Sequence, residues 1–242
     1  IPGNAGTDLI AENVKIELND FEAIKEFIKL NAIDLVLVGP EKPLVEGIVD
    51  FLEKHNVKVF GPNKIASQLK ESKAFTKNLC KKYNIPTAKF GIFEDSKSAL
   101  NFLKSCNLPI VIKADGLASG KGVYICEKKE EYIEAVKEIF GGKFGEAKQI
   151  LIEEFLKGEE MSFFVICDGE NYKKFSTAQD HKRVSEGDKG KNTGGMGAYS
   201  PSRLENENLN NKILNKIIEP TLKGLKELKT SFRGFLYAGL MI

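Results

Sequence analysis

The stretch at residues 110–126 most constrains the fold of this chain, because it reads as a strand, a glycine-rich loop and a second strand. An apolar β-branched run ends in Lys113, and a strand pattern resumes at 123–125. The glycines of the loop are Gly116, Gly120 and Gly122. Backbone N–H groups in such a loop can surround phosphate oxygens while an embedded lysine neutralises their charge.

A P-loop is the obvious alternative, and it requires Gly-x-x-x-x-Gly-Lys-Ser/Thr followed by a helix. Here the spacing is one residue short, Gly122 stands at the hydroxyl position, and a strand pattern follows. The sequence therefore predicts a hairpin flap over phosphates. A flexible hairpin tip without a ligand is the simpler interpretation of the same pattern.

The composition is that of an ordinary globular protein, with 242 residues, 42% hydrophobic and 29% charged. This length suits one large or two small domains. A formal net charge of +2 argues against a general nucleic-acid or membrane surface, and no apolar run approaches the length of a membrane span. The four cysteines form no C-x-x-C pair, which favours reduced thiols and a cytoplasmic location over zinc or disulfides.

Residues 1–70 alternate between helix and strand patterns, which predicts part of a Rossmann-like parallel sheet. The patterns indicate a helix capped by Asn19 or Asp20, a strand at 33–38 covered on both faces, a helix over 44–52 and a strand at 57–60. A loop is expected at 39–43, at the carboxyl end of a strand, where such sheets bind ligands. A plain connecting turn is an equally good interpretation of that loop.

Residues 71–242 are predicted to form a two-layer α+β domain, whose smaller layer spans about 86–152 and bears the flap. Ser72 is a fair N-cap for a helix to about Tyr83. Lys73 then lies in the first turn, where the helix dipole disfavours a cation. That placement favours an anionic ligand only weakly, and solvent exposure is the simpler interpretation.

The second half of this domain contains a polar stretch of more than fifteen residues at 179–201, which is expected to be a functional loop. A helix kinked at Pro220 is expected over about 208–229. The final residues, 234–242, look like a buried strand. Because a sheet rarely stops in such a run, we expect the chain to be a segment of a longer protein.

The lysines and acids together match what a nucleotide site needs. Lys73, Lys113 and the flap offer cations and N–H groups for phosphates, and Glu160 follows shortly after the strand that reaches Glu153. A strand edge can pair with adenine through backbone groups, and a carboxylate can accept hydrogen bonds from ribose hydroxyls. The sequence therefore predicts a nucleotide held between two layers.

Five segments resemble the phosphoribosylamine–glycine ligase family, also called glycinamide ribonucleotide synthetases, of the ATP-grasp superfamily. They are Ser72-Lys-Ala-Phe-Thr-Lys77, Ile112-Lys-Ala-Asp-Gly-Leu-Ala-Ser-Gly-Lys-Gly122, Ile152-Glu-Glu-Phe-Leu-Lys-Gly-Glu-Glu160, Gln179-Asp-His-Lys-Arg183 and Asn192-Thr-Gly-Gly-Met-Gly-Ala-Tyr-Ser-Pro201. The last two, with Pro2-Gly-Asn-Ala-Gly-Thr7 and Gly39-Pro-Glu41, point to this family within the superfamily. The resemblance covers essentially the whole chain. It implies an α/β ATP-grasp fold at 71–242, preceded by part of a Rossmann-like domain at 1–70.

The resemblance also implies contacts for ATP. The phosphates would meet two lysines and the flap, the adenine would meet Glu153 and the backbone of Leu156, and the ribose would meet Glu160. The implied ATP-binding residues are Lys73, Lys113, Gly116, Ser119, Gly120, Lys121, Gly122, Glu153, Glu154, Phe155, Leu156 and Glu160.

A second set of residues would, by the same resemblance, face phosphoribosylamine and glycine, with 192–196 closing the pocket. These residues are Gly3, Asn4, Asp180, His181, Lys182, Arg183, Asn192, Thr193, Gly194, Gly195 and Met196. Lys182 and Arg183 are better phosphate ligands than His181, whose contact with substrate is an open alternative.

The reaction that the resemblance implies joins glycine to phosphoribosylamine through glycyl phosphate, with ATP cleaved to ADP and phosphate and with Mg²⁺ or Mn²⁺ present. The family's metal ligands, a Glu and an Asn, would follow Ile242, so we expect no metal site in this segment and no turnover by it alone. We expect a monomer or weak dimer that binds small molecules and neither nucleic acid nor membranes. The alternatives are another ATP-grasp ligase or carboxylase, a non-catalytic ATP-binding module, and an α/β domain that binds no nucleotide.

Overall fold

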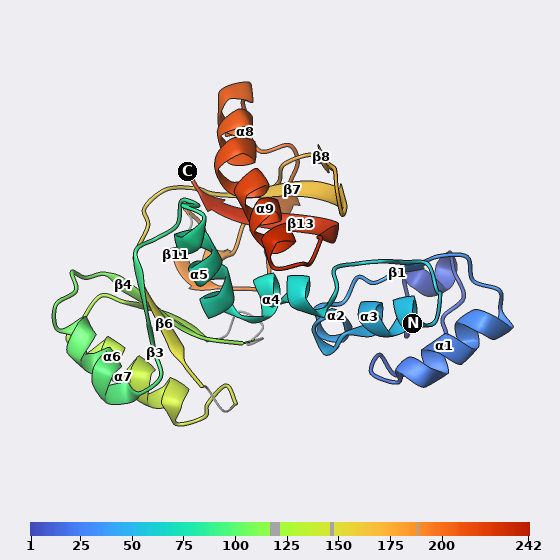
Figure 1. Ribbon diagram of the computed structural model, residues 1–242. Coiled ribbons are helices and arrows are strands. Elements are labelled where there is room, and N and C mark those ends of the chain that lie inside the picture. The colour runs from blue at the N-terminus through green and yellow to red at the C-terminus, as the bar shows by residue number, and fades with distance from the viewer. Residues whose placement is uncertain (117–121, 146–147, 188) are drawn as a thin grey trace.

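The computed structural model describes residues 1–116, 122–145, 148–187 and 189–242. Its elements form an N-terminal part, a small α+β layer and a larger α+β layer (Figure 1). Each of these parts has its own cluster of buried apolar residues. No helix among the described residues is long and apolar enough to cross a membrane.

The N-terminal part contains η1 (Thr7–Leu9), α1 (Phe21–Leu30), β1 (Val36–Leu37), α2 (Glu41–Glu46), α3 (Ile48–Lys54) and β2 (Val59–Phe60). The two strands pair in parallel, which confirms the prediction from the strand–helix–strand pattern. Asp20 caps α1 as expected, because its side chain accepts a hydrogen bond from the backbone N–H of Ala23 at 3.0 Å.

The sequence predictions for this part were wrong in three details. The strand expected at 33–38 has only two residues, and it is not covered on both faces, because Leu37 is 68% exposed. The single helix expected at 44–52 is two helices, because Gly47 adopts a left-handed φ of +98° that ends α2. The loop expected at 39–43 is partly helical, since α2 begins at Glu41.

Two helices, α4 (Lys64–Glu71) and α5 (Lys73–Lys82), lead from the N-terminal part into the layers. Ser72 caps α5 as predicted, and its Oγ accepts a hydrogen bond from the backbone N–H of Phe75 at 3.1 Å. α4 packs into the core of the larger layer through Ala66.

The small layer is a four-stranded antiparallel sheet in the order β3-β6-β4-β5 with α6 and α7 on one face. Its elements are β3 (Phe90–Phe93), α6 (Ser96–Leu103), β4 (Ile110–Ala114), β5 (Val123–Cys126), α7 (Lys129–Phe140) and β6 (Ile150–Glu154). Alternate residues of β4 and β6, such as Ile112 and Ile152, are fully buried against the helices. The residues between them, including Lys113 and Glu153, therefore lie on the opposite face.

The larger layer is a sheet in the order β13-β7-β8, covered by helices. Its elements are β7 (Glu160–Asp168), β8 (Tyr172–Lys174), α8 (Glu207–Ile213), a π-helical segment (Leu214–Ile218), α9 (Glu219–Glu227) and β13 (Arg233–Met241). Every second residue of β7, from Met161 to Cys167, is buried against these helices.

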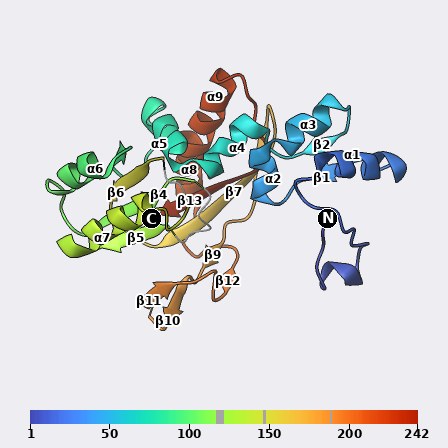
Figure 2. The same ribbon diagram turned by 90° about the horizontal axis from the view of Figure 1, so that it is seen from below.

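Residues 179–187 and 189–201 contain four short strands in two antiparallel ladders rather than the single loop that we expected, because their backbone N–H and C=O groups pair with each other. The strands are β9 (Gln179–Asp180), β10 (Arg183–Ser185), β11 (Lys189–Asn192) and β12 (Ala198–Tyr199). In Figure 2 they project from the body of the molecule below the two layers.

Two further expectations for the larger layer need correction. The helix over 208–229 is interrupted by a π-helical segment just before Pro220, which has no N–H to continue the ladder to residue 216. The final strand is buried on one face only, because the helices of this layer pack against the face that carries Leu236, and Phe235 and Tyr237 are exposed on the other face.

Candidate functional site

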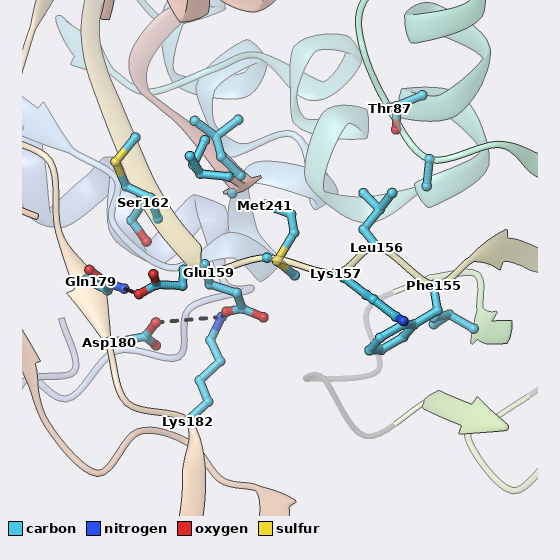
Figure 3. A pocket seen from close by; sticks show the side chains of 18 of the residues that line it. Thr87, Phe155, Leu156, Lys157, Glu159, Ser162, Gln179, Asp180, Lys182 and Met241 are labelled. Carbon is cyan, nitrogen blue, oxygen red and sulfur yellow. Dashed lines mark hydrogen bonds and ion pairs between the residues drawn. The ribbon is translucent and has the colours of Figure 1, made fainter. Parts of the chain in front are cut away.

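A cleft with a volume of about 1390 Å³ lies between the two layers. One wall is the face of β4 and β6 that points away from the helices, and the other is the open face of β7 and β13. The connection at 155–159 joins the two walls and also lines the cleft, where Figure 3 shows Phe155 and Leu156 across from Gln179 and Asp180. The predicted site residues that line it are Lys113, Glu153, Glu154, Phe155, Leu156, Glu160, Asp180, His181, Lys182 and Arg183.

Glu153 is the acid buried at the wall formed by β4 and β6, and it is only 3% exposed. In the β4–β6 ladder it lies diagonally across from Lys113, whose ammonium forms an ion pair with Oε2 of the carboxylate. The ammonium of Lys77, from α5, forms an ion pair with Oε1. Removing one partner of such a buried pair typically costs about 3–5 kcal/mol. The contact of Glu153 with adenine stays a prediction, since its carboxylate is already engaged by two lysines.

Lys73 does not line the cleft; its ammonium donates a hydrogen bond to the backbone carbonyl of Gly116 at 2.9 Å. Burial lowers the pKa of Lys73, the charge of Asp115 opposes this change, and the charge of Lys113 adds to it. The two lysines therefore lie close enough to repel each other, and a bound anion would relieve that repulsion.

Asp115 occupies the start of α5, where the sequence left open an anionic ligand. Its Oδ1 accepts hydrogen bonds from the backbone N–H groups of Lys73 at 2.6 Å and Ala74 at 3.2 Å. Its Oδ2 accepts from Ser72 Oγ at 3.0 Å and Gln149 Nε2 at 2.6 Å. The anion at this helix terminus is thus a side chain of the small layer, which ties the base of the flap to α5.

Glu160 lies at the start of β7, on the second wall of the cleft, and forms an ion pair with Lys182, which follows β9. Asp180 lies 3.7 Å from the same ammonium, and Figure 3 shows Lys182 pointing toward it. Burial acts to lower the pKa of Lys182, but the hydrogen bond and charge of Glu160 outweigh burial and raise it. Lys182 is therefore held charged between two carboxylates.

The backbone of residues 196–197 is hydrogen-bonded to that of His181, which follows β9 and lines the cleft. The N–H of Met196 donates to the carbonyl of His181 at 2.7 Å, and the N–H of His181 donates to the carbonyl of Gly197 at 2.8 Å. The ring of His181 lies 5.8 Å from that of Tyr199. Met196 is 61% exposed, so its predicted closure of the pocket stays a prediction.

The structure does not bring all predicted residues into the cleft. Among the residues whose side chains the structure describes, those that do not line it are Gly3, Asn4, Lys73, Gly116, Gly122, Thr193, Gly194, Gly195 and Met196, and the predicted contact of Asn192 stays a prediction. Asn4 lies in the N-terminal part, where its Oδ1 accepts hydrogen bonds from the backbone N–H groups of Gly6 and Thr7. Ser119, Gly120 and Lys121 lie outside the described residues, and their contact with phosphates stays a prediction.

Sequence reasoning assigned no role to four lysines that line the cleft, namely Lys77, Lys157, Lys212 and Lys216. Lys77 could have been found, because it follows Lys73 by four residues and so shares its helix face. Lys216 lies in the π-helical segment, which the sequence pattern did not reveal.

The residues that the structure describes include no group of three or more His, Cys, Asp or Glu side chains that could hold a metal ion. These residues alone do not fit a metal site, because a divalent cation such as Mg²⁺ needs several oxygen ligands in near-octahedral geometry.

Two family models together match the whole chain, and both describe the same enzyme family. The family described as Phosphoribosylglycinamide synthetase, N domain, matches residues 1–70, and that described as Phosphoribosylglycinamide synthetase, ATP-grasp (A) domain, matches residues 71–242. A phosphoribosylamine–glycine ligase of Mesorhizobium japonicum is 51% identical over the whole chain, and one of Escherichia coli O157:H7 is 48% identical. The chain spans 57% of the length of each of these two relatives.

Solved structures show the same similarity. The phosphoribosylamine–glycine ligase of Thermotoga maritima superposes with a TM-score of 0.83 at 36% identity, over 99% of this chain and 58% of that one. An N5-carboxyaminoimidazole ribonucleotide synthetase in complex with ADP superposes with a TM-score of 0.72 at 18% identity, over 99% of this chain and 58% of that one. This second likeness bears on the fold alone. The chain belongs to the phosphoribosylglycinamide synthetase family and has the ATP-grasp fold of that family.

Proposed function

We propose that the protein is an ATP-dependent carbon–nitrogen ligase that joins glycine to 5-phosphoribosylamine, giving glycinamide ribonucleotide, ADP and phosphate. The observation that carries the proposal is the cleft of about 1390 Å³, which Lys113 lines on one wall and Glu160 on the other. This volume exceeds the roughly 300–1,000 Å³ of a typical ligand pocket, which suits a nucleotide together with further substrates. The names of the ligases from Mesorhizobium japonicum and Thermotoga maritima support the choice of substrates.

In this proposal the triphosphate lies along the wall of the small layer. Lys113 and Lys73 neutralise its oxygens, and residues 116–122 close over them. The connection at 155–159 offers backbone groups to adenine, and Glu160 accepts hydrogen bonds from the ribose hydroxyls. The phosphoribosylamine and glycine occupy the side lined by Asp180 to Arg183, where cationic side chains suit the phosphate and carboxylate.

The chemistry follows from the poor reactivity of a carboxylate toward an amine. Transfer of the γ-phosphoryl group forms a bond between phosphorus and a glycine carboxylate oxygen, and the bond from phosphorus to ADP breaks. The amine nitrogen of phosphoribosylamine then attacks the carbonyl carbon, phosphate leaves, and the nitrogen loses a proton. The protein contributes by holding these groups in line and by neutralising charge, which dominate phosphoryl transfer. A closed flap would keep water from the acyl phosphate.

Three further features belong to the proposal. ATP would bind together with Mg²⁺ or Mn²⁺, which coordinates phosphate oxygens. The free thiols of all four cysteines fit the reducing cytoplasm. We also propose a monomer or weak dimer, with small molecules rather than nucleic acid or membranes as partners.

A thermal-shift titration with a non-hydrolysable ATP analogue tests the nucleotide site. At a hundredfold excess over Kd the analogue stabilises the protein by about 2.7 kcal/mol, which raises Tm by roughly 5–10 °C. Lys113→Met should reduce this shift. Lys104→Met, which removes an exposed lysine of the same layer, is the matched control and should not.

The reaction itself is tested by release of ADP that depends on both glycine and phosphoribosylamine, measured beside the Mesorhizobium japonicum ligase. The chain spans 57% of the length of that ligase, and we expect turnover by the chain alone to be far below that of the ligase. ADP release with another carboxylate and not with glycine would favour a different ATP-grasp ligase. Absence of any shift with the analogue would refute the nucleotide site.

A further inference from the structure

Lys77 is a cation of the cleft whose side chain is only 12% exposed, and neither the sequence motifs nor the proposed reaction assigns it to a ligand. It lies on α5, one turn after Lys73, and its ammonium reaches the cleft wall at Glu153. The same ammonium lies 2.5 Å from Thr87 Oγ1 and 5.4 Å from the centre of the Phe90 ring. The ammonium of Lys77 is thus held by protein groups rather than extended into the open space of the cleft.

Glu153 receives these two lysines on different oxygens, Lys77 on Oε1 and Lys113 on Oε2. Oε1 is completely buried and has no hydrogen bond of good geometry, so the attraction to Lys77 is an ion pair across the cleft wall. A buried carboxylate holds its counter-ion strongly, because water does not compete for it. If Lys113 were its only partner, the pair would be neutral and would offer little to an anionic phosphate.

The second lysine changes this balance. Two ammonium groups around one carboxylate leave one excess positive charge at the wall where the phosphates are proposed to lie. Lys113 is the more exposed of the two, so the excess charge is available at its ammonium. Lys73 lies near enough for its charge to act on Lys113, but its ammonium is engaged with Gly116.

We propose that Lys77 is a positioning residue that neutralises Glu153 from within the protein and thereby frees the charge of Lys113 for the phosphates of the nucleotide. This inference rests on the proposed ATP site and adds to it a residue that never touches the ligand. Its signature is selective: Lys77 strengthens binding of the phosphates and leaves binding of the nucleoside unchanged.

The test measures the affinities of the protein for ADP and for adenosine by calorimetry, and takes their ratio as the contribution of the phosphates. Lys77→Met keeps most of the aliphatic stem and removes the charge. We expect it to lower the ratio by about tenfold, the loss typical of one charge-assisted contact. Lys77→Arg should preserve the ratio. Lys82→Met, on the same helix but 61% exposed at its side chain, is the matched control and should also preserve it.

A double variant provides the decisive arm. In Lys77→Met combined with Glu153→Gln, Lys113 has lost its counter-ion, so we expect the ratio to return toward that of the unchanged protein. A role of Lys77 in packing alone would not be rescued in this way. If Lys77→Met does not fold, Lys77→Gln replaces it, because the amide can still donate to Thr87 or Glu153.

The outcomes separate this inference from the proposed function. If the unchanged protein binds neither ADP nor adenosine, the proposed nucleotide site is refuted and the inference fails with it. If the unchanged protein binds ADP but Lys77→Met keeps the same ratio as Lys82→Met, the proposed function stands and the inference is refuted. The inference is also refuted if the ratio for the double variant is no higher than the ratio for Lys77→Met.

Discussion

Replacing Asp115 by alanine should loosen the junction between the small layer and α5. Asp115 makes four hydrogen bonds, to Ser72, Lys73, Ala74 and Gln149. Loss of a cap at a helix start costs about 0.5–2 kcal/mol, and loss of a negative charge there costs about 0.3–1 kcal/mol. The side chain of Gln149 loses a partner worth about 1 kcal/mol. Ser72 retains its own bond to the helix, so we expect a total loss of about 2–3 kcal/mol in the free energy of unfolding.

Two controls isolate the bridge between layers from ordinary capping. Asp115→Asn keeps an acceptor oxygen but loses the charge, and should cost about 1 kcal/mol. Asp95 caps α6 within the small layer alone, by accepting from Ser98 N at 2.8 Å. Asp95→Ala should therefore cost about 1 kcal/mol, the ordinary loss for a helix cap.

Urea denaturation measures these losses, and amide hydrogen exchange locates them. In Asp115→Ala the backbone amides of Lys73 and Ala74 lose their acceptor, so their exchange should accelerate more than that of the later α5 amides. Unfolding midpoints for Asp115→Ala and Asp95→Ala that agree within error would refute the reasoning. Unchanged exchange at Lys73 and Ala74 would refute it independently.

Three further changes should each give a distinct result. The hydrogen bond from Lys174 lowers the pKa of Glu205 from 4.5 to about 2, so its charged form stabilises the fold above pH 4.5 and that stability is lost as the pH falls toward 2. Glu205→Gln should cost about 1–2 kcal/mol at pH 7, after allowance for solvent screening, and should flatten the pH dependence of Tm between pH 4.5 and 2. Gly3→Ala should destabilise the N-terminal part in urea, because a Cβ at Gly3, where φ is +84°, would lie 1.9 Å from Asn13 Oδ1. Phe163→Ala should lower the free energy of unfolding by about 3–5 kcal/mol in urea, because the ring is fully buried in the core of the larger layer.

The sequence predicted best what depends on local chemistry. Ser72 caps α5 and Asp20 caps α1 because a short polar side chain reaches an N–H only two or three residues away. The apolar β-branched run that ends in Lys113 predicted a strand, and β4 (Ile110–Ala114) contains that run. Such features need no knowledge of distant residues.

The sequence failed where partners are far apart along the chain. Asp115 reaches Lys73 across a separation of 42 residues, and no periodicity reveals such a contact. Residues 179–201 looked like a loop because each of their strands is only a few residues long, too short for an alternating pattern to be recognised. The π-helical segment likewise leaves the apolar spacing of its helix almost unchanged.

The candidate site also combines residues that local motifs identified with long-range partners that they did not identify. The sequence motifs gave ligand contacts to Glu153 and Glu160, whereas each of these carboxylates already contacts lysines of the protein. A carboxylate in a largely water-excluded wall must have a counter-ion even when no ligand is bound. Glu153, at 3% exposure, is such a carboxylate, so this wall needs a cation beyond those that a bound nucleotide would require, and Lys77 meets that need. Which lysines remain available to phosphates then depends on how the carboxylates are neutralised, a property of the whole charge arrangement rather than of any single motif.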